Sequence, residues 1–162
     1  YYTVDGVKID SSGLTLTKKD LFYNRPKLWC IRIQKLRWKQ RIISGFDDRK
    51  NSAGLKTLQI IVDNESDITR LKALLGIISS RLINFWCINF LSDDMNQSYL
   101  EKLPLKFETK FIKPISESVA RIITAKEKDS AADIKKLEME IDQLVYQLYG
   151  LTEEEIKIIE SN

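Results

Sequence analysis

The sequence predicts an α+β fold, in which a small twisted, mostly antiparallel sheet packs on a long helix and is followed by a helical C-terminal tail. Two observations predict it. In the first third of the chain, apolar and polar residues alternate with period two, as in half-buried strands. After Asn64 the apolar residues recur at helical spacing. We expect a β-rich unit at 1–112 and the helical tail at 113–162.

The sheet is expected to form around a strand near residues 28–34. Trp29 and Ile31 fall on one face of that strand, and Leu28 and Cys30 fall on the other. A hairpin connection around 35–38 would lead into its antiparallel partner. The expected strands are 14–17, 28–34, 41–46 and 57–62.

A long helix is expected near 67–91, because its apolar residues form a wide stripe that predicts deep burial. Ser66 or Asp67 is the expected N-cap. Residues 92–114 contain prolines that interrupt regular structure, so we expect an irregular connection there. The further expected helices are 115–125, 131–149 and 152–160.

Local signals mark two helix ends and two buried thiols. Gly150 is the expected C-cap of the middle tail helix. Thr152, with Glu155 three residues later, has the form of a capping box for the last helix. Cys30 and Cys87 each lie in an apolar run, where a free thiol behaves as a small hydrophobic side chain.

Composition excludes several classes of protein. Hydrophobic residues make up 43% of the chain, which is enough for a core. The chain has no histidine and two isolated cysteines, so Ser-His and Cys-His catalysis and a zinc site are not expected. Its six glycines are scattered and form no phosphate loop. Charged residues interrupt the apolar stretch 71–91, and no secretory signal is visible, so we expect a cytoplasmic protein.

Charge is distributed unevenly along the chain. Residues 25–41 contain seven bases and no acid, whereas ten acids and four lysines lie between residue 127 and the end. The β-rich part therefore favours a polyanion as partner, and the helical tail favours a solvated or protein-facing role.

The basic hairpin and the loop after it have the chemistry of a DNA-reading surface. Lysine and arginine contact phosphates, arginine also binds guanine edges, and asparagine pairs with adenine. Trp38 would insert into the DNA, stack on a base or support the neighbouring side chains. The alternative is a solubilising edge strand and an ordinary polar turn. The candidate DNA-binding residues are Arg25, Lys27, Arg32, Lys35, Arg37, Trp38, Lys39, Arg41, Arg49, Lys50 and Asn51.

Two carboxylate pairs, Asp47 with Asp48 and Asp93 with Asp94, are found in expected loops. Paired acids occur in metal-dependent nucleases. No third acid and lysine accompany either pair at matching spacing, so we interpret both as solvated loop residues.

Three segments resemble a known family. Residues 74–86, L-L-G-I-I-S-S-R-L-I-N-F-W, resemble the L-L-G-I-L-N-S-K-L-I-N-F helix of the TaqI-like C-terminal specificity domain. Residues 99–105 resemble its Y-L-x-x-L-P-I segment, and residues 141–156 are similar to the ending I-D-x-L-V-Y-x-L-Y-G-L-T-E-E-E-I. Upstream, residues 25–62 match the family's order of a P-K-I strand, a second strand, a loop and a third strand, so the resemblance covers roughly 23–160. Residues 1–22 do not align, and 47–54 vary within the family.

The resemblance implies a DNA target-recognition domain of an adenine-specific DNA methyltransferase or of a fused type II restriction-modification enzyme. In that family an upstream domain binds S-adenosylmethionine, flips the adenine and methylates it with an N-P-P-Y motif. Here the three prolines, Pro26, Pro104 and Pro114, are not adjacent. We therefore expect no catalytic centre and no cofactor in this chain. The implied partners are double-stranded DNA and an upstream methyltransferase domain, and the absence of an initial Met suggests a piece of a longer protein.

Three alternatives stay open. The first is a specificity subunit of a multi-subunit (type I) restriction enzyme, with 115–149 as a spacer. The second is a protein-interaction module with a basic edge. A nuclease is the least supported, because it lacks a metal-binding set.

Overall fold

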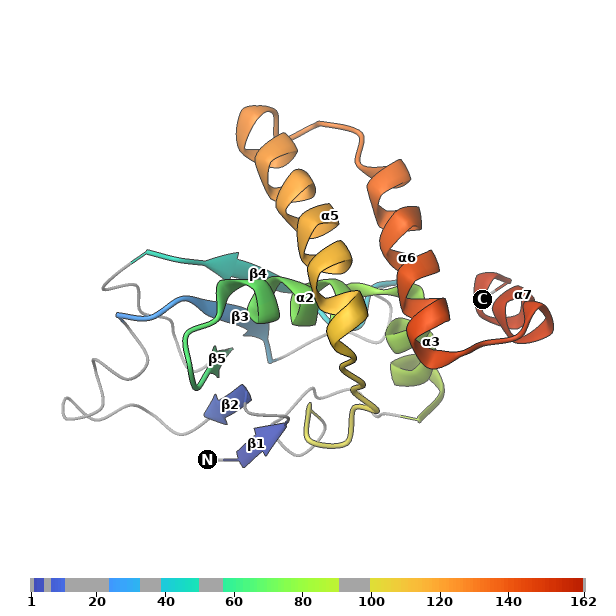
Figure 1. The fold of residues 1–162 in the computed structure, drawn as a ribbon, viewed down its shortest axis with the longest axis horizontal. Helices are drawn as coiled ribbons and strands as arrows, with labels where there is room; N and C mark the ends of the chain where they lie inside the picture. The colour runs from blue at the N-terminus through green and yellow to red at the C-terminus, as the bar shows by residue number, and fades with distance from the viewer. Residues whose placement is uncertain are drawn as a thin grey trace.

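The strands form one antiparallel sheet that is covered on one face by helices (Figure 1). The computed structural model describes residues 2–4, 7–10, 24–32, 39–49, 57–90 and 100–161, the first two ranges by their backbone alone. The α+β class expected from the sequence is confirmed. The strands are β1 (Tyr2–Val4), β2 (Val7–Asp10), β3 (Lys27–Ile31), β4 (Ser44–Asp47) and β5 (Leu58–Asp63), in the spatial order β1-β2-β5-β3-β4.

β3 lies between β4 and β5 and is antiparallel to both. The predicted pairing of β3 with the strand that follows it is confirmed. Both strands are shorter than expected, since β3 ends at Ile31 and β4 begins at Ser44. β1 and β2 were not predicted. The expected strand 14–17, the last two residues of the expected strand 28–34 and the expected connection around 35–38 lie outside the described residues.

The predicted two-sided pattern of β3 is confirmed. Leu28 and Cys30 have no exposed surface and face the helices, whereas Trp29 is half-buried on the opposite face. Leu28 lies opposite Phe46 on β4 and Ile61 on β5, so one apolar row crosses the three strands. This row is the floor of the core.

Gly150 and Thr152 end and begin helices as predicted. Gly150 has a left-handed φ of 68°, and its N–H donates to the Gln147 carbonyl at 3.1 Å. Thr152 and Glu155 form the reciprocal capping box. Asp67 is the N-cap of the first long helix, as one of the two expected candidates. The described helices are α2 (Ile68–Ser79), α3 (Arg81–Phe90), α5 (Thr109–Lys128), α6 (Lys135–Tyr149) and α7 (Glu153–Glu160).

The prediction of one helix at 67–91 is wrong. The chain forms two helices, α2 and α3, which are bent by 55° at Ser80. The Ser80 hydroxyl donates to the Ile77 carbonyl at 2.7 Å, which gives the backbone of α2 a side-chain partner where the helix ends. Apolar spacing continues through the bend, so the period alone did not reveal it.

The expected irregular connection 92–114 ends earlier than predicted. α5 begins at Thr109 and includes Pro114. Proline removes one N–H from the helix, which normally favours a break. Directly after it, Ile115 is fully buried against α2, and this tertiary packing outweighs the local preference. Residues 91–99 lie outside the described part.

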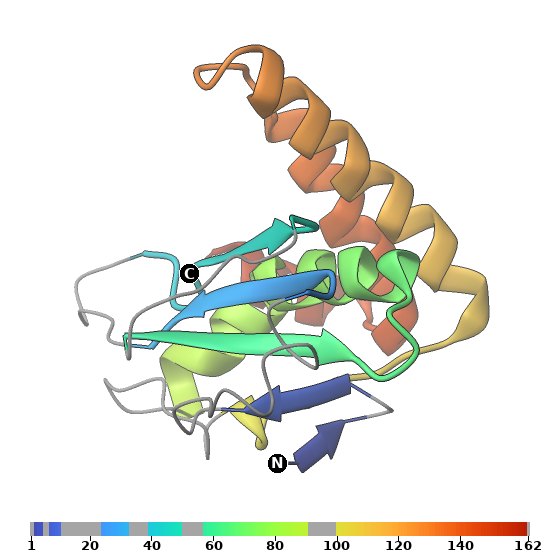
Figure 2. The same ribbon diagram turned by 90° about the vertical axis from the view of Figure 1, so that its left-hand side faces the viewer.

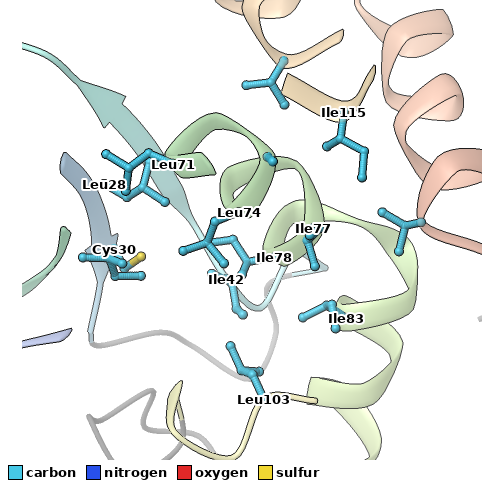
Figure 3. Close-up of a cluster of buried hydrophobic side chains, with 14 of the residues drawn as sticks. Leu28, Cys30, Ile42, Leu71, Leu74, Ile77, Ile78, Ile83, Leu103 and Ile115 are labelled. Atoms are coloured by element: carbon cyan, nitrogen blue, oxygen red, sulfur yellow. The ribbon is translucent and has the colours of Figure 1, made fainter. Parts of the chain in front are cut away.

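One continuous apolar core joins the sheet, α2, α3, α5 and α6. In Figure 3 side chains from β3 and from α5 approach α2 from opposite sides. Gly76 permits the close approach of α5, because a Cβ at that position would lie 2.5 Å from Ile115 Cγ2 and 3.0 Å from Val119 Cγ2. α5 and α6 run antiparallel and extend beyond the sheet as a helical hairpin (Figure 2).

Across the described ranges, no single helix has both the length and the apolar character needed to cross a membrane. The pair α2 and α3 has both only when taken together across its 55° bend, and much of α2 is buried in the core.

We predict that Gly76→Ala destabilises the fold by about 1–2 kcal/mol. The alanine gains up to about 1 kcal/mol of helix propensity. Its methyl group collides with two β-branched, buried side chains that have little rotamer freedom, and overpacking of this kind costs about 1–3 kcal/mol. Urea unfolding measures the difference. Gly45→Ala is the matched control, because a Cβ there meets nothing within 4 Å. A Gly76→Ala variant at least as stable as wild type would contradict the contact.

Candidate nucleic-acid interface

The described basic residues of the predicted hairpin lie at opposite ends of β3. At one end Arg32 follows β3, and its backbone N–H donates to the Thr57 carbonyl at 2.8 Å. Residues 39–43 lead into β4 at the same end; together with Arg32 and Thr57 they form what we call the hairpin end. Lys27 lies at the other end, opposite Asp47. Strand geometry separates the two ends by roughly 13 Å.

The hairpin end offers positive charge to solvent. Lys39 is exposed and Arg32 is half-buried. The Nε of Arg32 is buried and has no hydrogen-bond partner among the described residues. Two cations at one strand end suit contacts to phosphates.

Hydrogen bonds with the α2–α3 bend hold residues 39–41 in place. Gln40 Nε2 donates to the Ser79 carbonyl at 3.4 Å. Asn84 Oδ1 accepts from the Arg41 N–H at 2.7 Å, and Asn84 Nδ2 donates to the Lys39 carbonyl at 2.8 Å. Asn84 was not among the predicted site residues. Its signals in the sequence were an amide within an apolar helical stretch and its place in segment 74–86.

Arg41 does not lie on this surface. It is 4% exposed, and its charge lies close enough to the Cys87 thiol to affect it. Burial raises the pKa of Cys87 to about 12, and Arg41 offsets part of that increase. Cys30 and Cys87 are free and buried, as expected from the sequence.

Lys27 is likewise enclosed, at the other end of β3. It has no exposed surface, its Nζ donates to the Arg49 carbonyl at 3.2 Å, and it lies 5.9 Å from the Trp29 ring centroid. Burial lowers the pKa of Lys27, although nearby Asp47 favours the charged form. Lys27 therefore contributes to packing in this structure.

Asp47 was expected to be a solvated loop residue, and that interpretation is wrong. It is 5% exposed and accepts three hydrogen bonds: from Trp29 Nε1 at 2.9 Å, from the Arg49 N–H at 3.0 Å and from Arg49 Nε at 2.9 Å. The Arg49 side chain itself is 79% exposed. Asp47 thus fixes the end of β4 and holds one edge of an accessible guanidinium.

Six of the predicted DNA-binding residues remain. The structure describes one of them, and the other five lie outside the described residues. Arg25 is half-buried, and its Nη2 donates to the Asn64 carbonyl at 3.0 Å. The following candidates lie outside the described residues and stay predictions: Lys35, Arg37, Trp38, Lys50 and Asn51.

A cleft of about 540 Å³ lies between the α2–α3 bend and the α5–α6 hairpin. Its lining combines apolar side chains such as Ile122 and Met139 with Gln40, Arg81 and Asp142. Within the described ranges no three histidine, cysteine or acidic side chains are grouped as metal ligands.

Asp142 connects α6 to the start of α3. Its Oδ1 accepts from the Arg81 N–H at 2.8 Å, and its Oδ2 lies 3.2 Å from Arg81 Nε. The carboxylate is 7% exposed. Burial raises the pKa of Asp142 to about 6; the two interactions with Arg81 lower it in part, and Glu138 and Glu160 raise it further.

The chain is similar in fold to part of a solved restriction-modification enzyme. The sequence matches no protein-family model, and it matches no curated protein sequence. The fold is similar to part of the type IIL restriction-modification enzyme MmeI, solved in complex with DNA, with a TM-score of 0.60 and 17% identity. The match covers 80% of this chain and 19% of that one, so the chain corresponds to about a fifth of MmeI. This chain therefore shares a fold with a segment of a restriction-modification enzyme.

Lys39 and Arg41 make a matched pair for a stability test, because they are neighbouring bases with opposite exposure. Arg41→Ala removes a buried side chain and should lower the free energy of unfolding by roughly 1–3 kcal/mol, whereas Lys39→Ala should change it by under about 0.5 kcal/mol. Urea titration followed by circular dichroism measures both. Equal stability of the two variants would show that Arg41 is not enclosed.

Asp142 gives a prediction for the pH dependence of stability. Its folded pKa of about 6 exceeds the ordinary value of 3.8, so between these limits the folded state binds the proton that the unfolded state has released. Stability should therefore fall as pH rises from 4 to 6, by up to about 3 kcal/mol from this group. Asp142→Asn cannot titrate. In urea titrations, the free energy of unfolding of wild type relative to that of Asp142→Asn should therefore fall as pH rises across this window. A difference between the two that stays constant would contradict the raised pKa.

Proposed function

We propose that this chain is a DNA target-recognition domain of a restriction-modification system. The supporting observation is a coincidence of fold and charge: the fold resembles part of a restriction-modification enzyme solved with DNA, and one end of the sheet exposes basic side chains. Phosphate contacts from such side chains would set the register of the duplex, and base-edge contacts would select the site.

The finer proposal is that the chain is a TaqI-like specificity domain. The sequence segments 74–86, 99–105 and 141–156 support it. An upstream domain in the same polypeptide would then bind S-adenosylmethionine and methylate adenine, and this chain would have no catalytic role. Segment 141–156 corresponds to the end of α6 and the start of α7, where Gly150 ends the first helix and Thr152 caps the second.

Burial narrows the set of proposed DNA contacts. Among the described candidates, Lys39 and Arg49 are exposed and Arg32 is half-buried. Arg25 is half-buried as well, but its Nη2 already donates to the Asn64 carbonyl, so it is not counted among the proposed contacts. Lys27 and Arg41 are assigned to packing. The five undescribed candidates keep their proposed roles.

A type I specificity subunit is a second reading of the same fold, with α5 and α6 as its spacer. In this chain α5 and α6 are antiparallel, because residues 129–134 reverse the chain direction (Figure 1). Side chains of both helices also belong to the core around α2. These two features favour a packed domain over one long spacer.

We predict that the chain binds duplex DNA with a strong dependence on salt. Three phosphate contacts would give a slope of about −2.7 in a plot of log K against log salt, and thus roughly 40-fold weaker binding when salt rises from about 50 to about 200 mM. Fluorescence anisotropy with a labelled duplex measures this. Lys39→Ala should flatten the slope by about 0.9.

Lys136→Ala is the control, because Lys136 is an exposed lysine on α6, far along the chain from the hairpin end. It should bind like wild type. Binding that does not respond to salt, or an equal effect of both substitutions, would refute the proposed surface. A partner protein bound independently of salt would favour the interaction-module alternative.

A further inference from the structure

Asn84 uses both ends of its amide to bridge one residue of the hairpin end. Its Oδ1 accepts the Arg41 N–H at 2.7 Å, while its Nδ2 donates to the Lys39 carbonyl at 2.8 Å. These two backbone groups lie on either side of Gln40, so the Asn84 side chain binds the backbone both before and after that residue. A primary amide can do this because its oxygen accepts while its nitrogen donates.

Asn84 is itself held by the α2–α3 bend. Its backbone N–H donates to the Ser80 carbonyl at 3.0 Å, within the first turn of α3. The Asp142 carboxylate fixes the start of that turn by binding Arg81 through both oxygens. The direction of α3 after the 55° bend therefore determines where the Asn84 amide lies.

The backbone of Lys39 is consequently fixed even though its side chain is exposed. A lysine on a fixed backbone loses less conformational freedom when it meets a phosphate than one on a free loop, so pre-organisation strengthens the contact. The Gln40 hydrogen bond to the Ser79 carbonyl restrains the same segment.

We propose that Asn84 is a positioning residue for DNA binding, which holds the 39–41 backbone so that Lys39 meets a phosphate. This inference rests on the proposed function. It assigns a role to a side chain that does not itself touch DNA, and it predicts that the energetic effects of Asn84 and Lys39 are coupled.

The test is a double-mutant cycle of Asn84→Asp and Lys39→Ala, measured as duplex affinity across a salt series. Aspartate keeps the acceptor for Arg41 but replaces the donor to the Lys39 carbonyl with a repelling oxygen. Loss of one phosphate contact predicts about eightfold weaker binding at about 0.1 M salt and a slope flatter by about 0.9. The double variant should be no weaker than either single variant, because both remove the same contact.

Asn89→Asp is the matched control. Asn89 is an exposed asparagine on the same helix, and its Nδ2 donates to the Phe85 carbonyl of α3 itself at 2.8 Å. The control introduces the same charge and should bind nearly as wild type. Hydrogen exchange of the Arg41 amide, measured without DNA, should stay slow in Asn84→Asp, which keeps the acceptor, and should accelerate in Asn84→Ala, which removes it.

The outcomes separate the two proposals. Salt-dependent binding by wild type, with Asn84→Asp equal to Asn89→Asp or with additive losses in the cycle, overturns the role of Asn84 and leaves the proposed function standing. Absence of DNA binding by wild type overturns both. Thermal unfolding is followed for each variant. If Asn84→Asp does not fold, Asn84→Ser, which keeps a smaller donor and acceptor, is assayed in the same cycle with the same criteria.

Discussion

The burial of α2 on two sides is the constraint on which the rest of the structure depends. One side of the helix lies on the apolar row of β3, β4 and β5, and the other receives α5 and α6 (Figure 3). A helix enclosed in this way must be apolar around most of its circumference, and it needs a small residue where a second helix crosses closely. Gly76 meets that need against Ile115 and Val119.

The same enclosure explains why the bend at Ser80 carries so many polar contacts. The Ser80 hydroxyl donates to a backbone carbonyl where α2 ends. Asp142 accepts a hydrogen bond from Arg81 at the start of α3. Asn84 continues the connection to residues 39–41. Buried polar groups are costly unless each finds a partner, so such a network specifies one arrangement of its members. A hydrogen-bonded route thus runs from α6 through α3 to the hairpin end.

Local signals made the caps, the strand faces and the fold class predictable, whereas tertiary contacts decided the rest. Gly150 and Thr152 act within a few residues of themselves, and the alternation around Leu28 needs only the strand period. The break at Ser80 and the helical Pro114 depend on partners far away in the sequence. For the same reason, counting bases between 25 and 41 did not separate exposed Lys39 from buried Arg41, because burial depends on the strand register and on α3.

The number of accessible cations limits the DNA affinity that this chain could supply, and thus bears on how the proposed function would be divided between domains. Three described cations that neutralise three phosphates would strengthen binding only about 10²-fold at physiological salt. Specific DNA binding typically has dissociation constants of about 10⁻⁸ to 10⁻¹¹ M. In the proposed function the described surface would therefore hold and orient a duplex without supplying the whole affinity. The remainder has to come from further contacts, either in the undescribed candidates such as Arg37 and Asn51 or in a second domain that closes on the same DNA. A domain with this modest share would release DNA readily on its own and select a site only together with its partner, as the proposed division between recognition and methylation requires.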